Sequence, residues 1–482
     1  MISWNYCKFV ILLSITFNFF QCSFPKIDES LLKYDIYFRL LKNSPSQTTS
    51  NGQQQTSPTS NPSSDTSSDS SVITEQAQGR TLSGNVVGLL SIGLKLRNSD
   101  GREITLNPGQ TSFSIQNTQL GTYSLTIQRQ ALAQRCVVTN PSGNSQSSVT
   151  NITVTCSGIG EVGMGLWDTG VTQCYTNVNA SASACPNAAF PGQDGAIAPT
   201  MARSFTIRSD GNIKDNATGL IWKPCIAGLS GVNCSVGVAT TTDFATAQTK
   251  CGALPWRVPT PKELMSIIDF INPVYGINSN FPNHPGGLYL WSNLNTATTL
   301  TLGLSIDTGR IELLNKASTV IGHVQCVNDS EVVTVVENFT DLGNGIIRDE
   351  VNGLEWEKCI DGLSGATCSV GVFSSQLWQD RLNYCENLTL GGFTDWRMPN
   401  IHELTSLVDF TRFALSTTLN PIFVGSPREV YHSSTTTGYW NSHSGSYYSS
   451  VGNFPFIAGS FAAANEKNQS HPTRCVRGPI VQ

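Results

Sequence analysis

The sequence is poor in charge and in histidine, and these shortages exclude several functions. Only 13% of the residues are charged, and the formal net charge is −5. The chain has no run of Lys and Arg, so it lacks the electrostatic footprint of a nucleic-acid-binding protein. It has 6 histidines, none at a zinc-type spacing from a cysteine, and no CxxC motif, which argues against metal ligation by its cysteines. We therefore expect no cofactor and no nucleic-acid partner.

Long apolar runs are also scarce. The exception, residues 9–20 (FVILLSITFNFF), is too short to span a bilayer comfortably and follows a weakly positive start, a pattern typical of a signal peptide. The stretch that ends in Cys22 resembles the cleavage site of bacterial lipoproteins, in which the cysteine is lipidated. We predict a signal peptide over residues 1–21 and a lipid on Cys22, which gives the chain a membrane partner. Ordinary secretion, with Cys22 removed or incidental, is the alternative.

Cysteine, in contrast, is abundant, with 14 residues. Apart from Cys7 in the signal peptide and Cys22, the cysteines form groups with even counts. Even counts in an exported chain predict disulfides made in an oxidising compartment. The groups are Cys136 and Cys156; Cys174 and Cys185; Cys225, Cys234, Cys251 and Cys326; and Cys359, Cys368, Cys385 and Cys475.

The strongest signal in the chain is a duplication. Residues 219–238 (GLIWKPCIAGLSGVNCSVGV) align without a gap to 353–372 (GLEWEKCIDGLSGATCSVGV), and most positions are identical. Further along, PWRVPTPKELMSIIDF (255–270) corresponds to DWRMPNIHELTSLVDF (395–410). The C-terminal two-thirds of the chain therefore contains two copies of one cysteine-rich module, of which the second is the more acidic.

Composition divides the rest of the chain. Ser, Thr, Gln, Asn and Pro dominate residues 43–79, a segment that cannot bury enough apolar surface to offset its chain entropy. Residues 80–157 show short alternating runs between turns, and their cysteine-bracketed ending resembles that of a β-sandwich repeat from bacterial surface proteins, which implies a stalk. The predicted segments are a signal peptide (1–21), a lipid-anchored tether base (22–42), a disordered linker (43–79), a β-sandwich stalk (80–157), and two modules (158–327 and 328–482), called the first and second copy below.

Each copy is expected to contain two helices. The predicted ranges are 242–251 and 261–270 in the first copy, and 376–385 and 401–410 in the second. Thr260 or Asn400 can cap the later helix of each copy, and Glu263 or Glu403 at the third helical position completes a capping box. The remainder of each copy is expected to form short strands and long loops.

These features together resemble the Lcl-type C-terminal domain. The resemblance rests on a TGLxW strand, a cysteine-bracketed GLSG insert, a helix that ends in Cys and the phrase WRxPxxxEL. That family is widespread in bacterial exported proteins and is distantly similar to the C-type-lectin-like fold. The resemblance implies two helices packed on a twisted antiparallel sheet in each copy. The predicted fold is a small β-sandwich followed by two tandem α+β, C-type-lectin-like, disulfide-stapled modules.

The repeated residues are interpreted as structural. Arg257 and Glu263 are expected to pair around a helix start as a framework contact, as are Arg397 and Glu403. Trp256 and Trp396 are expected to fill the core, and Trp222 and Trp356 each belong to a predicted strand. A catalytic role would need a nucleophile or a metal shell beside these residues, and the sequence shows neither.

Four cysteines in each copy allow three pairings. We predict that Cys225 pairs with Cys234, and Cys359 with Cys368, across the short GLSG loop. Bonds from Cys251 to Cys326 and from Cys385 to Cys475 would then tie the first helix of each copy to its last strand.

Two possible sugar-binding features depart from their expected patterns. Calcium-dependent lectins use a carboxylate after a Trp-Asn pair, whereas the corresponding residues here are Trp291-Ser292-Asn293 and Trp440-Asn441-Ser442, so we expect no calcium-mediated binding. Some relatives act as adhesins toward sulfated polysaccharides, which attract clustered cations. A cationic patch would have to gather near the C-terminus, and scattered solvated charges are the alternative. The residues concerned are Arg428, His432, His443, His471, Arg474 and Arg477.

The expected function is that of a non-enzymatic, surface-exposed outer-membrane lipoprotein with tandem ligand-binding modules. An adhesin for extracellular matrix or carbohydrate is one form of it. One alternative is an enzyme related to the sulfatase-modifying proteins, which share a similar RLPTxxEW phrase but need reactive cysteines. The other is a purely structural envelope protein. The ligand and the oligomeric state stay open.

Overall fold

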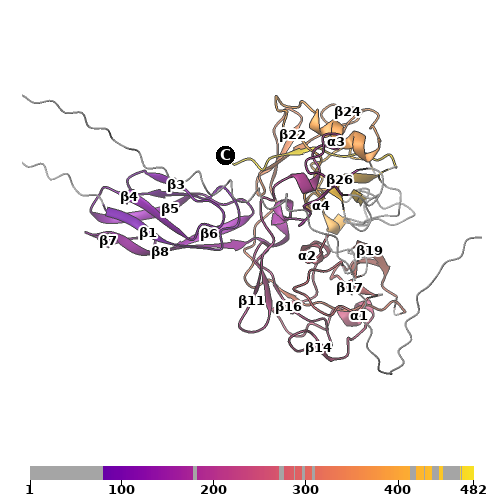
Figure 1. Ribbon diagram of the computed structural model, residues 1–482, viewed down its shortest axis with the longest axis horizontal. Coiled ribbons are helices and arrows are strands. Elements are labelled where there is room, and N and C mark those ends of the chain that lie inside the picture. Colours follow the sequence, from indigo (N-terminus) through magenta and orange to yellow (C-terminus); the bar gives the residue numbers. More distant parts are fainter. Residues whose placement is uncertain are drawn as a thin grey trace, which may run out of the picture. The chain divides into compact units, whose positions relative to one another are not determined.

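A computed structural model describes most of the chain beyond residue 79. The described residues are 80–176, 182–270, 276–286, 288–295, 299–306, 310–317, 319–412, 419–427, 429–436, 444–448, 467 and 469–481. They belong to one compact unit, Glu75–Gln482 (Figure 1). The predicted signal peptide, Cys22, tether base and linker lie outside the described residues. None of the described helices has the length and apolar character needed to cross a membrane.

Residues 80–158 form two four-stranded sheets that enclose a core of their own. One sheet has the order β4-β1-β8-β6 and the other β3-β2-β5-β7. Alternation in the sequence explains the packing, since in β4 (SFSIQN) Phe113 and Ile115 point inward while the serines face solvent. The strands are β1 (Arg80–Val87), β2 (Lys95–Asn98), β3 (Glu103–Thr105), β4 (Ser112–Asn117), β5 (Gly121–Arg129), β6 (Gln134–Thr139), β7 (Ser142–Ser145) and β8 (Val149–Gly158).

The first copy is built around a five-stranded sheet with the order β11-β12-β13-β20-β16. A three-stranded sheet, β17-β18-β19, and a two-stranded ribbon, β14-β15, complete it. Its elements are η2 (Gly160–Leu166), β9 (Cys174–Tyr175), β10 (Ala182–Ser183), η3 (Asp194–Ala196), β11 (Phe205–Ile207), β12 (Ile213–Asp215), β13 (Ile221–Trp222), β14 (Leu229–Ser230), β15 (Val236–Gly237), α1 (Phe244–Ala247), β16 (Trp256–Arg257), α2 (Pro261–Ser266), β17 (Tyr289–Trp291), β18 (Leu300–Ser305), β19 (Arg310–Asn315) and β20 (Val327–Asn328).

The second copy repeats this plan with the sheet β21-β22-β23-β28. Arg397 and Val476 form a single bridge at the place where β16 pairs with β20 in the first copy. Its elements are β21 (Phe339–Asp341), β22 (Ile346–Asp349), β23 (Leu354–Glu357), β24 (Leu363–Ser364), β25 (Val370–Gly371), α3 (Trp378–Glu386), α4 (Ile401–Ser406), η4 (Phe410–Arg412), β26 (Val430–Thr436), β27 (Ser444–Tyr448) and β28 (Val476–Arg477).

The two copies share one hydrophobic core. A single buried cluster contains Trp222 and Leu264 from the first copy together with Trp356 and Leu404 from the second. Helices α2 and α4 both contact η2, so the chain between the sandwich and the first sheet lies against both copies. The two copies are therefore packed against each other and are not separate domains joined by a linker.

The prediction of α+β, C-type-lectin-like modules is wrong. The described chain is mostly β, with many small sheets, and its helices are short: α1 has 4 residues, α2 and α4 have 6, and α3 has 9. Helix α1 covers only part of the predicted 242–251 because the chain turns tighter after Ala247, where Thr249 and Lys250 donate to carbonyls three residues back. Helix α2 ends at Ser266, and Ile268 then bridges to Ile277 as extended chain. The spacing of apolar residues in the sequence indicated helices here, but it could not show that they would be this short.

Six disulfides connect the 12 cysteines from Cys136 onward. They join Cys136 to Cys156, Cys174 to Cys185, Cys225 to Cys234, Cys251 to Cys326, Cys359 to Cys368 and Cys385 to Cys475. The pairing predicted for the two copies is confirmed. In each copy one short bond joins the segment before a two-stranded ribbon to the turn between its strands, and we call β14-β15 and β24-β25 the stapled ribbons.

Candidate functional site

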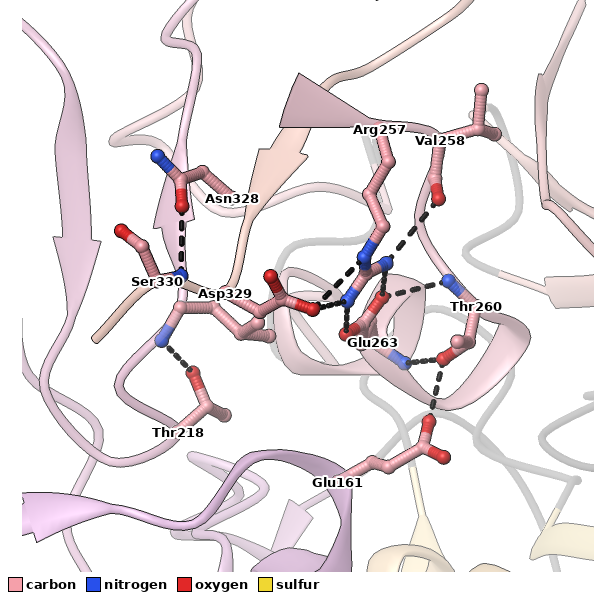
Figure 2. Close-up of polar contacts among 10 residues, drawn as sticks. Glu161, Thr218, Arg257, Val258, Thr260, Glu263, Asn328, Asp329 and Ser330 are labelled. Carbon is pink, nitrogen blue, oxygen red and sulfur yellow. Dashed lines mark hydrogen bonds and ion pairs between the residues drawn. The ribbon is translucent and has the colours of Figure 1, made fainter. Parts of the chain in front are cut away.

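The repeated Arg–Glu pair organises the start of α2 in the first copy (Figure 2). Arg257 donates from Nη1 and Nη2 to the two carboxylate oxygens of Glu263, at 2.7 and 2.6 Å. Glu263 also accepts the Thr260 amide at 2.8 Å, while its own amide donates to the Thr260 hydroxyl oxygen at 3.1 Å, so the predicted capping box is present. The Thr260 hydroxyl donates in turn to Glu161 of η2 at 2.6 Å. One carboxylate therefore fixes both the helix start and the arginine of β16.

The second copy has the same pair, but its arginine is less exposed to solvent. Arg397 makes the same two-pronged contact with Glu403, and Glu403 accepts the Asn400 amide at 2.8 Å. In the first copy Arg257 also contacts Asp329, at 2.9 Å, but in the second copy Arg397 meets only the Gly478 carbonyl there, at 3.4 Å. The side chain of Arg397 is 14% exposed and that of Arg257 27%. The pairs are framework contacts, as predicted from the sequence.

A small buried cavity of about 90 Å³ lies beside the second pair and is lined by Asp194, Arg397 and Glu403 among others. Asp194 accepts the hydroxyls of Thr169 and Thr435, both at 2.7 Å. Burial raises the pKa of the Asp194 carboxyl to about 7 despite these bonds. Both hydroxyls therefore already donate to the Asp194 carboxyl. Because Thr435 belongs to β26 and Asp194 to η3, this contact is suited to holding β26 against η3.

Burial is also the main influence on the pKa of His402, the buried histidine of α4. His402 lies edge-on to Trp167 and Phe270, and its Nδ1 is 3.2 Å from the Trp167 carbonyl oxygen. Burial lowers the pKa of His402 to about 4. Its counterpart in α2 is Lys262, whose Nζ donates to the Ser406 carbonyl at 3.3 Å. These two positions join α2 to α4 across the shared core.

The predicted tryptophans separate into two groups. Trp222, Trp356 and Trp396 are buried, the first two in edge contact with Phe281 and Phe423. Trp256 packs against a small core cluster but is only partly buried, so it fills the core less completely than predicted. In the second copy an insertion places Leu388 and Leu390 over Trp396, whereas the shorter first copy lacks it. The Lys223 ammonium covers the Trp256 ring instead, 4.0 Å from its centroid.

Of the described residues at the lectin-like positions, Trp291 and Ser292 are internal, and Asn293 is partly buried. Trp291 donates from Nε1 to the Thr242 carbonyl at 2.9 Å, and the Ser292 hydroxyl donates to the Leu302 carbonyl at 2.6 Å. Both side chains are fully buried. Trp440, Asn441 and Ser442 lie outside the described residues. Within the described part of the chain, no group of three His, Cys, Asp or Glu residues could hold a metal ion.

Most of the described basic residues near the C-terminus are buried and paired. Arg474 is 1% exposed and donates to the carbonyls of Glu357 and Lys358, and Arg477 pairs with Glu355 and Asp395. His432 is fully buried against His471, with ring centroids 4.9 Å apart, and burial lowers its pKa to about 3. Arg428 and His443 lie outside the described residues. Both readings of the sequence are therefore wrong for His432, Arg474 and Arg477, which the fold buries, while His471 is partly buried.

An open groove of about 710 Å³ lies in the first copy. One wall is the β11–β12 hairpin, with Ile207 and Asn212. The opposite wall is formed by residues 223–225 and 229–233, which include strand β14 of the stapled ribbon, and residues 279–282 close one side. Ile207 is 73% exposed and Val232 95% exposed, so the rim presents apolar side chains to solvent.

The second copy has an ion pair at the corresponding place. Asp341 takes the position of Ile207, and Lys358 that of Pro224, in the aligned copies. The Lys358 Nζ lies 2.6 Å from Asp341 Oδ2, and this contact lowers the pKa of Asp341. Sequence reasoning missed the groove, although these two differences between the copies were visible in the alignment of 207 with 341 and of 224 with 358.

Comparison with known proteins identifies the module. A sequence model of the Lcl C-terminal domain matches residues 211–328 and again 345–477. No curated protein and no solved structure matches the chain. The two matched segments coincide with the two copies of the duplication, and together with the disulfides they indicate a bacterial exported protein.

Proposed function

The chain belongs to the Lcl C-terminal domain family, with two tandem copies, and from this premise we propose that it is a non-catalytic, ligand-binding lipoprotein of the bacterial surface. In this proposal a lipid on Cys22 anchors it in the outer membrane. The copies then meet ligands outside the cell, such as extracellular matrix or carbohydrate.

The observation that carries the proposal is the position of the exposed apolar residues. In the first copy Val232, Val236 and Val238 are 95%, 59% and 83% exposed on the stapled ribbon. In the second, Val370 and Val372 are 61% and 82% exposed at the positions equivalent to 236 and 238. A disulfide that holds exposed apolar side chains on a loop adds little to a core, but it presents a preorganised contact surface. Duplication of that surface would raise the apparent affinity for a repetitive ligand.

Binding of the full chain to a panel of matrix proteins and glycans tests the proposal. We expect binding that weakens when the ribbon valines are made polar, in V236S/V238S and V370S/V372S. The control is V87S/V137S in the sandwich, where the valines are 52% and 58% exposed and binding should not change. No binding to any member of the panel, or an equal loss of binding in V87S/V137S, would contradict a binding role and favour a structural one.

The anchor is tested separately. Metabolic labelling with a fatty acid should mark the wild-type chain and not C22S, and protease treatment of intact cells should digest the modules. Label in C22S, or complete protection from protease, would contradict the lipid-anchored surface placement.

A further inference from the structure

The groove of the first copy lies next to an open sheet edge. Strand β11 is the edge strand of the five-stranded sheet (Figure 1). Arg208 donates to the Asn212 carbonyl and Asn216 to the Ser204 carbonyl, and Thr206 pairs with Lys214 between them. In an antiparallel ladder the alternate residues then direct their N–H and C=O groups outward. These are Phe205 and Ile207, and no partner for their backbone groups lies among the described residues.

An open edge of this kind selects for extended polypeptide. Two outward residues offer two donors and two acceptors with the spacing of a strand, which only another strand matches. Native edges are commonly protected by charged side chains. Ile207, at the outer end of β11, is instead exposed and apolar, and its side chain lines the groove beside the edge.

The charges of the groove favour an uncharged occupant. Asp210 is held by the Asn212 amide at 3.0 Å and by Arg208 at 3.6 Å, and these contacts lower its pKa. The ammonium of Lys223, the other charged lining residue, lies over Trp256. The lining therefore has compensated charges of both signs and no cationic cluster for a sulfated polymer. None of the described lining residues is aromatic, so a stacking platform for a sugar ring is missing as well.

The second copy has the same edge with different chemistry. Leu342 donates to Ile346 and Glu350 to Asn338, so Phe339 and Asp341 are the outward residues of β21. The outer position is now the carboxylate of Asp341, tied to Lys358. An approaching apolar strand would have to desolvate this ion pair, which is unfavourable. The first copy lacks that obstacle.

We propose that the groove of the first copy, and not its counterpart in the second, binds an extended, uncharged polypeptide segment that adds a strand to β11. The aliphatic side chains of the segment enter the groove between Ile207 and the stapled ribbon. This inference rests on the proposed binding function and names the ligand class of one of its surfaces.

The test uses the full chain and a phage-displayed library of random linear peptides. Enriched peptides should be uncharged and rich in branched aliphatic residues. Their synthetic versions should bind the double variant I207D/P224K at least about tenfold more weakly, because this variant copies the ion pair of the second copy. Both replaced residues lie on the groove wall, and an unchanged melting temperature verifies folding. The matched control is D341N/K358Q, which removes the ion pair of the second copy and should leave the first-copy affinity unchanged.

Enrichment of charged peptides, or equal affinity for wild type and I207D/P224K, would overturn the inference. The same two proteins are also tested on the panel of matrix proteins and glycans. Panel binding that I207D/P224K retains, with no enriched peptide, would refute the groove assignment and leave the proposed function standing. Absence of both kinds of binding would refute both.

Discussion

Equivalent residues in the two copies share one main partner but differ in their surroundings, and this difference determines how much each contact contributes to stability. Arg257 is more exposed and has a second ion-pair partner in Asp329, whereas Arg397 is more enclosed and its ion pair is with Glu403. Removing one member of a buried pair leaves an uncompensated charge, which costs far more than loss of an exposed pair.

We predict that R397K destabilises the protein more than R257K does. Lysine keeps the charge but cannot form the two-pronged contact with Glu403. We expect a loss of about 3 kcal/mol for R397K and about 1 kcal/mol for R257K, measured by urea unfolding. Equal losses would show that solvent reaches both pairs alike.

A second residue-scale prediction concerns acid stability. The pKa of His402 is near 4 in the folded protein and about 6.5 when unfolded. Between these values the unfolded chain binds a proton that the folded chain does not, so the free energy of unfolding falls as the pH drops from 6.5 toward 4. In H402Q this contribution is absent. Relative to H402Q, the wild type should lose up to about 3 kcal/mol over that range. Parallel pH profiles of the two proteins would contradict the burial of a neutral imidazole.

The secondary-structure elements show which helix boundaries could be predicted from the sequence. The caps at Thr260 and Asn400 placed the starts of α2 and α4 correctly, because capping is a local interaction between a side chain and nearby amides. Soon after these helices end, Ile268 and Val408 form bridges to Ile277 and Leu419, contacts beyond the next few residues that helical periodicity does not encode. For the same reason the α+β prediction overstated the helices of both copies.

The disulfides give the element-scale prediction. The bond from Cys251 to Cys326 closes 75 residues, and the bond from Cys225 to Cys234 closes 9. In the chain-entropy model the longer loop contributes about 4 kcal/mol and the shorter about 2.5 kcal/mol. Thermal unfolding of C251S/C326S should therefore show the larger decrease in melting temperature. A larger decrease for C225S/C234S would mean that the ribbon supports the core directly.

At the scale of the whole molecule, the shared core predicts cooperative unfolding. Trp222 and Trp356 belong to one buried cluster with residues of both copies, so neither copy can lose its structure without exposing the other. Differential scanning calorimetry should give one transition for both copies, and R397K should lower it without splitting it. Two resolved transitions would show that the copies unfold independently.

The duplication itself was plain in the sequence, but the difference between the copies acquired meaning only in three dimensions. Ile207 and Pro224 are seventeen positions apart in the chain, and nothing local indicates that they face each other across a groove. Their counterparts, Asp341 and Lys358, form an ion pair only because the same fold brings the two walls together. Arg474 and Arg477 were misread for a related reason, since their partners include a carbonyl and a carboxylate of β23, more than a hundred residues earlier.

The central claim is that two similar modules share one framework, and that the peptide-binding groove of the first is replaced in the second by the ion pair between Asp341 and Lys358. Calorimetric titration of the full chain with an enriched peptide tests it most directly, because it counts sites. The account predicts one site per chain in the wild type, and none in I207D/P224K. Two equal sites per chain, or one site retained in I207D/P224K, would contradict it.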